Sequence, residues 1–116
     1  MLNKYKWRKR VLIIFSHDTE FMEDQKRLLK NVRSGIVDRD MILFGFNEDT
    51  PPFSLDPSVE LDELRNSLSL KENTIVLLGK DGGVKAKWEK LVDPRTIFDI
   101  IDVMPMRQRE MRERGR

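Results

Sequence analysis

The stretch 74-TIVLLGKDGGVKAKWEK-90 decides the fold, because it places glycines and lysines between two apolar runs. A phosphate-binding loop would need the spacing G-x-x-x-x-G-K-[ST] and a helix directly after it. The spacing here differs, and the residues that follow the glycines alternate in polarity as a strand does. Asp81-Gly82 between apolar runs indicates a hairpin, since tight primed turns need positive φ angles. The stretch therefore predicts two antiparallel strands rather than a nucleotide site.

The second strand of this hairpin, residues 84–90, has the pattern of a sheet edge. Val84, Ala86 and Trp88 share one face, which we expect to be buried. Lysines on the opposite face would protect an exposed edge from pairing with other chains. Two further strands are predicted at residues 11–15 and 41–46.

The N-terminal residues 4–10 also alternate, and the pattern predicts that they extend the first strand outward. Tyr5 and Trp7 fall on one side of this segment and its basic residues on the other. We expect Trp7 to cover the sheet.

A helix is predicted over residues 19–33, where apolar side chains recur at helical spacing. Asp18 or Thr19 provides its N-cap, and Gly35 provides its stop. Residues 47–60 contain three prolines and are predicted to form a long loop. A short helix marked by Leu61, Leu64 and Leu68 follows it.

The C-terminal part opens a last helix at Asp93, an N-cap residue, with Pro94 in the first helical position. Pro105 should end or kink this helix. Residues 106–116, an arginine-rich tail, then form either a new helical turn or a frayed end.

The predicted order is β-α-β-α-β-β-α over a single domain, residues 1–116. The first two strands are joined by a crossover helix and should pair in parallel, while the last two form the hairpin. This is the layout of an α/β, thioredoxin-like fold, a four-stranded mixed sheet flanked by helices.

Composition excludes several kinds of chemistry. The 116 residues include no cysteine, so thiol redox catalysis, disulfides and thiolate metal sites are ruled out. One histidine, His17, is too few for a histidine-built zinc site, and we predict no metal and no cofactor. The apolar run 11–15 is too short for a signal peptide or a membrane span, so the chain as given is expected to be soluble and cytoplasmic.

The junction between the first strand and the first helix is where a thioredoxin-like fold places its reactive thiol, stabilised by the helix N-terminus. The sequence there contains Ser16, His17 and Asp18. A nucleophile and a base so close on an extended chain rarely reach each other, and no third partner can be identified. We therefore interpret Asp18 as a helix cap and leave an enzyme without cysteine chemistry as the least supported hypothesis.

Several stretches together resemble the P-DUDES family, a thioredoxin-like domain found in bacterial proteins of unknown function and in vertebrate sushi-repeat and matrix-associated proteins. The matching stretches are 5-YKWRKRVLIIF-15, Gln25, 39-RD-40, 64-LR-65, 76-VLLGKDGGVK-85 and 101-IDVMPMRQREM-111. The resemblance implies a relative of peroxiredoxins and thioredoxins that lacks the redox cysteine. It assigns no established biochemical activity.

The leading functional hypothesis is a protein-binding or adaptor module that docks an unknown partner. Methionine adapts to varied partners, and arginine forms bidentate pairs with carboxylates or phosphates. The alternative is that the methionines seal the core while the arginines are solvated. The candidate binding residues are Arg39, Lys80, Asp81, Lys85, Met104, Pro105, Met106, Arg107, Arg109 and Glu110.

Charge distribution supports a second hypothesis, a binder of anionic polymers such as nucleic acid or polysaccharide. The basic extension 1–10 and the tail 107–116 hold 10 of the 22 basic residues and 2 of the 20 acidic ones, although the net charge is only +2. Tyr5 and Trp7 could stack on bases, but no nucleic-acid-binding motif accompanies them.

Overall fold

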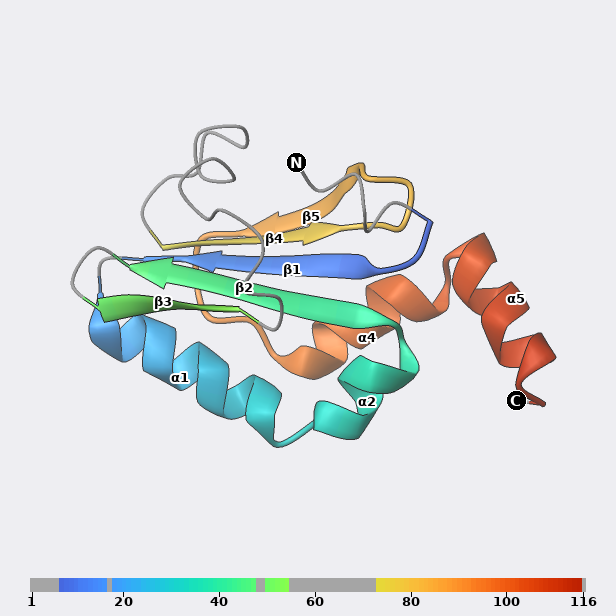
Figure 1. The fold of residues 1–116 in the computed structure, drawn as a ribbon, viewed down its shortest axis with the longest axis horizontal. Helices are drawn as coiled ribbons and strands as arrows, with labels where there is room; N and C mark the ends of the chain where they lie inside the picture. The colour runs from blue at the N-terminus through green and yellow to red at the C-terminus, as the bar shows by residue number, and fades with distance from the viewer. Residues whose placement is uncertain (1–6, 17, 48–49, 55–72, 116) are drawn as a thin grey trace.

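The apolar run that follows the basic start forms β1 (Arg10–Phe15), the middle strand of a five-stranded sheet with the order β3-β2-β1-β4-β5 (Figure 1). The structure, a computed structural model, describes residues 7–16, 18–47, 50–54 and 73–115. The other elements are α1 (Thr19–Lys30), α2 (Arg33–Asp38), β2 (Met41–Asn47), β3 (Thr50–Ser54), β4 (Thr74–Leu78), β5 (Val84–Trp88), α4 (Pro94–Asp102) and α5 (Pro105–Glu113).

The strand pairing confirms the predicted topology. β1 pairs with β2 in parallel, β1 with β4 antiparallel, and β4 with β5 as the predicted hairpin. The prediction of four strands was one too few, because β3 adds an edge strand within the segment expected to be a loop. Pro51 and Pro52 lie in β3, and proline is tolerated there because an edge strand leaves one row of amides without a ladder partner.

The hairpin turn is confirmed, but its geometry differs from the one expected. Of Asp81 and Gly82, only Gly82 has a positive φ, +85°. Backbone hydrogen bonds from Gly82 N–H to Gly79 O and from Gly79 N–H to Gly83 O close a three-residue loop rather than a two-residue primed turn. Beyond the turn, the pairing of β4 with β5 shifts register between Leu77 and Leu78.

The first helix is shorter than predicted. α1 ends at Lys30, and a separate short helix, α2, follows it. α2 contains Arg33, which was predicted to lie in the first helix, and Gly35, which was predicted to end that helix. Gly35 lies inside α2, where a Cβ atom would sit 2.8 Å from the Phe98 ring. Close packing against α4, rather than a helix stop, is therefore the reason for glycine at this position.

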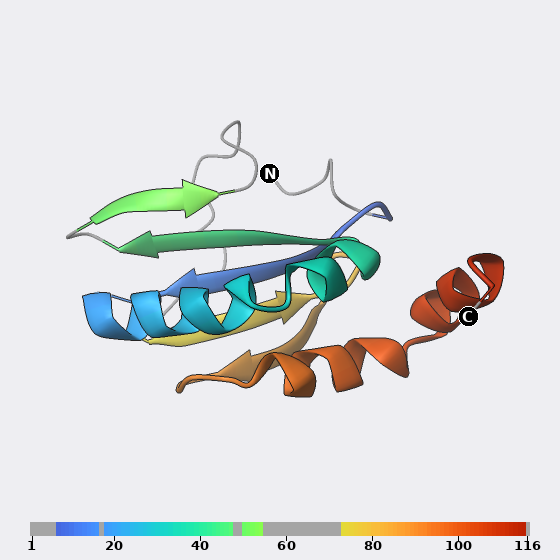
Figure 2. The ribbon, with the colours of Figure 1, turned by 90° about the horizontal axis from the view of Figure 1, so that it is seen from below.

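Helices α1, α2 and α4 all lie on one face of the sheet (Figures 1 and 2). Their buried side chains form one core with Leu12 and Ile14 of β1: Met22, Leu29, Ile36, Ile97 and Ile101. Alternation along the strands places Val11, Ile13, Phe44 and Val76 on the opposite face, and these side chains are buried as well. The apolar runs from which central strands were predicted are therefore buried on both faces of the sheet.

The ends of the described chain correct two expectations. Trp7 does not extend β1 or cover the sheet, since it has a φ of +69° and is 60% exposed. In β5, Ala86 and Trp88 pack against the core as predicted, but Val84 is exposed.

At the other end, Pro105 does separate two helices. The tail after it forms α5 rather than a frayed end. The predicted helix at Leu61, Leu64 and Leu68 lies outside the described residues. Within the described part, none of the helices is both long enough and apolar enough to cross a membrane.

Candidate functional site

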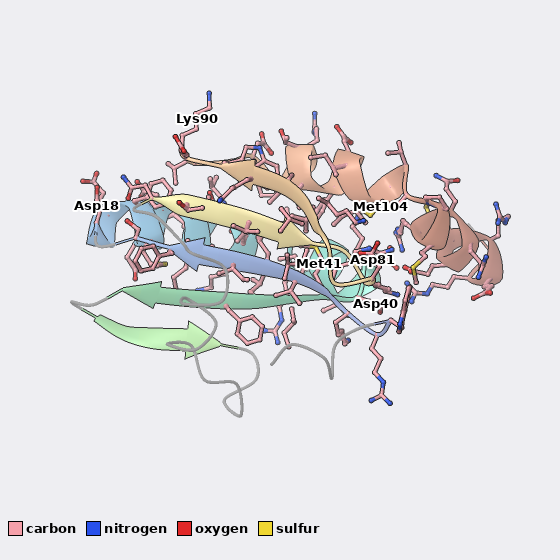
Figure 3. The ribbon with its side chains drawn as sticks, turned by 90° about the horizontal axis from the view of Figure 1, so that it is seen from above. Asp18, Asp40, Met41, Asp81, Lys90 and Met104 are labelled. Atoms are coloured by element: carbon pink, nitrogen blue, oxygen red, sulfur yellow. The ribbon has the colours of Figure 1, made fainter. Side chains whose placement is uncertain are left out.

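Four predicted binding residues from distant parts of the sequence meet at the end of the sheet where β1 and β2 begin. They belong to a set of charged side chains that we call the ion network: Arg10, Asp38, Arg39, Asp40, Lys80, Asp102, Arg107, Glu110 and Arg114. Figure 3 shows Asp40 and Asp81 at this end of the sheet, close to α5, and Asp18 at the opposite end.

Glu110 joins the sheet to α5. Both of its carboxylate oxygens accept hydrogen bonds from Arg10, at 3.0 Å each, and Oε2 also accepts from Lys80 Nζ at 2.7 Å. Arg10 is 1% exposed and Lys80 is also buried, so this carboxylate pairs with two buried cations. Lys80 Nζ further donates to Asp40 at 2.9 Å.

Arg107 and Arg39 tie together α2, α4 and α5. Arg107 is 2% exposed and donates to the Asp38 carboxylate at 2.7 Å and to Asp102 at 3.2 Å. Arg39 binds Asp102 in a bidentate pair, with both distances 2.9 Å. Its guanidinium also lies over the Phe98 ring, 4.0 Å from the centroid, where the π face attracts a cation.

The local backbone explains how these groups come together. Arg10 shares the face of β1 that carries Leu12 and Ile14, so its side chain lies on the side of the sheet covered by helices. Asp40 adopts a left-handed conformation, φ +51°, and its carbonyl accepts the backbone N–H of Arg10 at 2.8 Å. Pro105 starts α5 in a new direction, and the spacing of Arg107 and Glu110 places both on one face of that helix.

The cations of the network keep its carboxylates ionised. Burial would raise the pKa of Glu110, but hydrogen bonds from Arg10 and Lys80 outweigh it and the pKa is lowered. The pKa of Asp102 is lowered against the effect of burial by Arg39 and Arg107. Lys80 and Arg114 likewise lower the pKa of Asp40 against its burial. For Arg107, contacts with Asp38 and Asp102 outweigh burial and raise the pKa.

The ion network links elements of the fold to one another rather than forming a reactive centre. It holds five cations and four anions, and each is engaged in an ion pair within the chain. Within the described ranges, Arg10 Nε is the one buried side-chain polar atom without a hydrogen-bond partner. No acidic or histidine cluster that could hold a metal ion is found among the described residues.

The remaining predicted residues do not join the network. Asp81 and Lys85 form their own ion pair at 2.8 Å across the hairpin turn, and Asp81 also accepts the Gly83 N–H, which together lower the pKa of Asp81. Met104 packs against the core, which agrees with the alternative interpretation that the methionines seal the core. Pro105, Met106 and Arg109 belong to α5, and Arg109 is exposed.

Sequence analysis missed five members of the network: Arg10, Asp38, Asp40, Asp102 and Arg114. Asp40 was part of the 39-RD-40 stretch that carries the family resemblance, but was not among the candidate binding residues. Arg10 directly precedes the apolar run 11–15, but no local pattern indicated that its side chain is buried. For the aspartates, only tertiary contacts reveal the role.

At the opposite end of β1, the junction with α1 is occupied by neutral hydrogen bonds. Ser16 is fully buried, and its hydroxyl bonds Asn73 and accepts the Asp18 N–H at 2.9 Å. Asp18 caps α1 as predicted, accepting the N–H groups of Glu20 and Phe21. Both polar side chains therefore stabilise the junction, while His17 lies outside the described residues.

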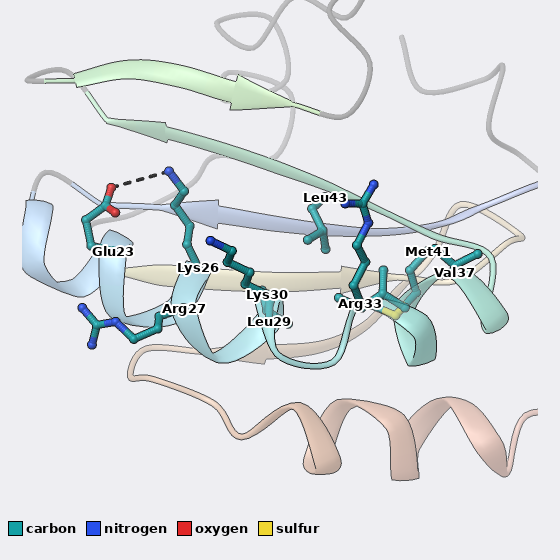
Figure 4. Close-up of a pocket in the computed structure, with 10 residues that line it drawn as sticks. Glu23, Lys26, Arg27, Leu29, Lys30, Arg33, Val37, Met41 and Leu43 are labelled. Atoms are coloured by element: carbon teal, nitrogen blue, oxygen red, sulfur yellow. Dashed lines mark hydrogen bonds and ion pairs between the residues drawn. The ribbon is translucent and has the colours of Figure 1, made fainter.

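A groove that sequence analysis did not identify runs between the helices and β2 (Figure 4). Its volume is about 610 Å³, and its apolar lining comes from Leu29, Ile36, Val37, Met41 and Leu43. Its rim carries Glu23 and four cations, Lys26, Arg27, Lys30 and Arg33. The signal in the sequence was the run of basic residues along the first helix.

Comparison with solved structures places the fold in the thioredoxin-like α/β class. The mitochondrial 2-Cys peroxiredoxin from Plasmodium falciparum is similar to this chain with a TM-score of 0.58 and 12% identity, over 99% of this chain and 84% of the peroxiredoxin. A thioredoxin-fold protein from Helicobacter pylori is similar with a TM-score of 0.50 and 16% identity, over 82% of this chain and 68% of the other. At these identities the similarity shows the fold alone.

The chain belongs to the family described as a domain of unknown function, DUF4174, which matches residues 1–110. Comparison with curated proteins gives no match. The family assignment leaves the activity to be inferred from the site.

Proposed function

We propose that this chain is a non-redox, thioredoxin-like module that acts by binding a protein partner. The observation that carries the proposal is the groove beside α1 and α2, which combines an apolar floor with a charged rim. Apolar surface with a few charged groups around it is the usual make-up of a binding site.

Two further observations favour binding over catalysis. The chain has no cysteine, and Ser16 at the strand–helix junction is buried and bonded to Asn73 and Asp18, so it is not presented to a substrate. The charged groups of the ion network are matched by one another. A catalytic acid or base would instead need a free face toward a substrate.

The structure also changes where binding is expected. Arg107 and Glu110 of the methionine–arginine segment are used in internal ion pairs, which leaves them few donors or acceptors for a partner. Truncation after Met104 would remove both residues and leave Arg10 buried without its carboxylate. Loss of binding in such a truncation would therefore reflect loss of stability.

Site-specific photo-cross-linking tests the proposal without disturbing the core. A photoreactive phenylalanine analogue replaces Val37, which lines the groove and is 65% exposed. The matched control carries the same analogue at Val103, which is 76% exposed at the C-terminus of α4. Cells that naturally express the chain are irradiated, and cross-linked proteins are identified by mass spectrometry.

We expect one protein to be captured from position 37 and not from position 103, and an excess of the unlabelled chain to compete it away. Identical capture profiles at the two positions, or profiles unaffected by competition, would overturn the proposal. The P-DUDES resemblance belongs to the same proposal, since such domains are also thioredoxin-like and lack the redox cysteine.

A further inference from the structure

The lining of the groove carries more positive than negative charge. Four of its ten lining residues are basic and one is acidic, an excess of three positive charges. The whole chain has a net charge of +2, so the residues outside the groove are slightly acidic in sum. A local field of this kind selects anionic partners more strongly than the net charge suggests.

Part of this charge is not neutralised inside the chain. Lys26 lies 3.5 Å from Glu23, and Arg27 lies 3.1 Å from Asp24, both within α1. Lys30 and Arg33 are exposed and form no ion pair with any residue in the described part of the chain. These two cations are available to a ligand at no cost in internal contacts.

The arrangement of the cations suits a ligand with several separated negative charges. Lys26 and Lys30 are four residues apart in α1, one helical turn, and Arg33 opens α2 three residues later. Figure 4 shows Lys26, Lys30 and Arg33 rising from the helices on the side of β2, along the length of the groove. A ligand with several negative charges along its length can engage all three of these positions.

We infer that the groove binds an acidic peptide segment of the partner, one in which glutamates or aspartates are interspersed with apolar side chains. This inference rests on the proposed function and names the chemistry of the partner. The carboxylates pair with Lys30, Arg33 and Lys26, while the apolar side chains lie over Leu43 and Val37. Arginine adds bidentate geometry, which carboxylates match.

The lining argues against other anionic partners. Single-stranded nucleic acid is bound by stacking its bases on aromatic side chains, and none is found among the ten described residues that line the groove. A membrane surface is flat on the scale of a groove and would contact the rim but not the floor. The apolar floor and the spaced cations of the groove together fit a peptide better than a nucleic acid or a membrane surface.

Fluorescence anisotropy with three synthetic peptides tests the inference on the intact chain. The probe is a short fluorescein-labelled peptide of alternating glutamate and leucine. In one control glutamine replaces every glutamate, and in the other serine replaces every leucine. The wild-type chain is compared with a groove variant that carries Lys30→Glu and Arg33→Glu. The control, called the β5 variant, carries Lys87→Glu and Lys90→Glu, on and just beyond the edge strand β5. The two variants change the net charge by the same amount.

We expect the groove variant to lose about tenfold in affinity for the glutamate–leucine peptide, since two favourable charges become repulsive. The β5 variant should lose less than about twofold, because its charges lie away from the groove. Both control peptides should bind more weakly than the probe, and added salt should weaken the probe further. Thermal unfolding of both variants checks that they fold.

Equal losses in the two variants would overturn the inference, because they would show only a net-charge effect. Binding that persists when glutamine replaces glutamate, or stronger binding to anionic lipid vesicles or single-stranded DNA than to the probe, would overturn it as well. If position 37 still cross-links a partner that the acidic peptide does not displace, the inference about acidity fails while the proposed function stands. If the peptide binds but position 37 captures no partner, the proposed function fails, and the inference about a segment of the partner fails with it.

Discussion

The two ends of β1 differ in how they satisfy their polar groups. At its start, buried Arg10 meets Glu110 of α5, a residue 100 positions away in the sequence. At its far end, buried Ser16 bonds to neutral Asn73 and to the backbone of Asp18. At the start of β1, charge pairs between residues far apart in the sequence hold α5 in place. At the end of β1, where related folds place reactive thiols, neutral hydrogen bonds connect the strand to the first helix. Polar side chains at both ends thus support the fold, and the binding that we propose is assigned to the groove instead.

The largest expected effect tests the charged end. Replacing Glu110 by alanine leaves Arg10 buried without its carboxylate and removes one of the two carboxylates that Lys80 contacts, and should lower the free energy of unfolding by about 3 kcal/mol. Urea denaturation measures it. Glu113→Ala on the exposed side of the same helix is the control and should change stability by less than about 0.5 kcal/mol. Equal effects in the two variants would show that Glu110 is no more important than a surface residue.

Acid should affect the same end with a smaller effect, because a protonated carboxyl can still form hydrogen bonds. The pKa values of Asp40, Asp102 and Glu110 are lowered in the folded chain, so these groups stabilise it above their unfolded pKa values, at about 4. This stabilisation is lost as pH falls from there through the folded pKa values. Thermal unfolding against pH should show the decline, and a Glu110→Gln variant should show a shallower one.

The uncharged end is tested by restoring a thiol. Ser16→Cys should lower stability by about 1–2 kcal/mol, because a thiol is a poorer hydrogen-bonding group than the hydroxyl it replaces. The new thiol should not react with Ellman's reagent in the folded chain, because position 16 is buried. Ser34→Cys, at an exposed site in α2, provides the reactive control. Rapid reaction at position 16 would mean that the junction is open.

The smallest expected effect concerns the cap of α1. Asp18→Ala removes the acceptor for two backbone N–H groups and should lower stability by about 1 kcal/mol. Asp18→Asn keeps a capping oxygen and should lose much less. Equal melting temperatures for the two variants would show that the cap contributes little at this end.

Much of the fold could be predicted because its signals are local. Continuous apolar runs marked β1, β2 and β4, a turn dipeptide marked the hairpin, and Asp93-Pro94 marked the start of α4. Edge strand β3 was missed because its prolines argue against a strand unless the strand is known to lie at an edge. The end of α1 was misplaced because Gly35 serves a contact with Phe98 of α4, which no local pattern reveals.

For the candidate site, the sequence alone determined features that depend on single residues and their neighbours, but not the tertiary contacts of the candidate residues. The absence of cysteine, the buried character of β1 and the cap at Asp18 follow from composition and short-range patterns, because each depends on one residue and its neighbours. Only the tertiary structure decided that Arg107 and Glu110 face inward and that Lys30 and Arg33 face a groove. An ion pair or a groove depends on distances between segments far apart in the chain, and those distances are set by how the helices pack on the sheet.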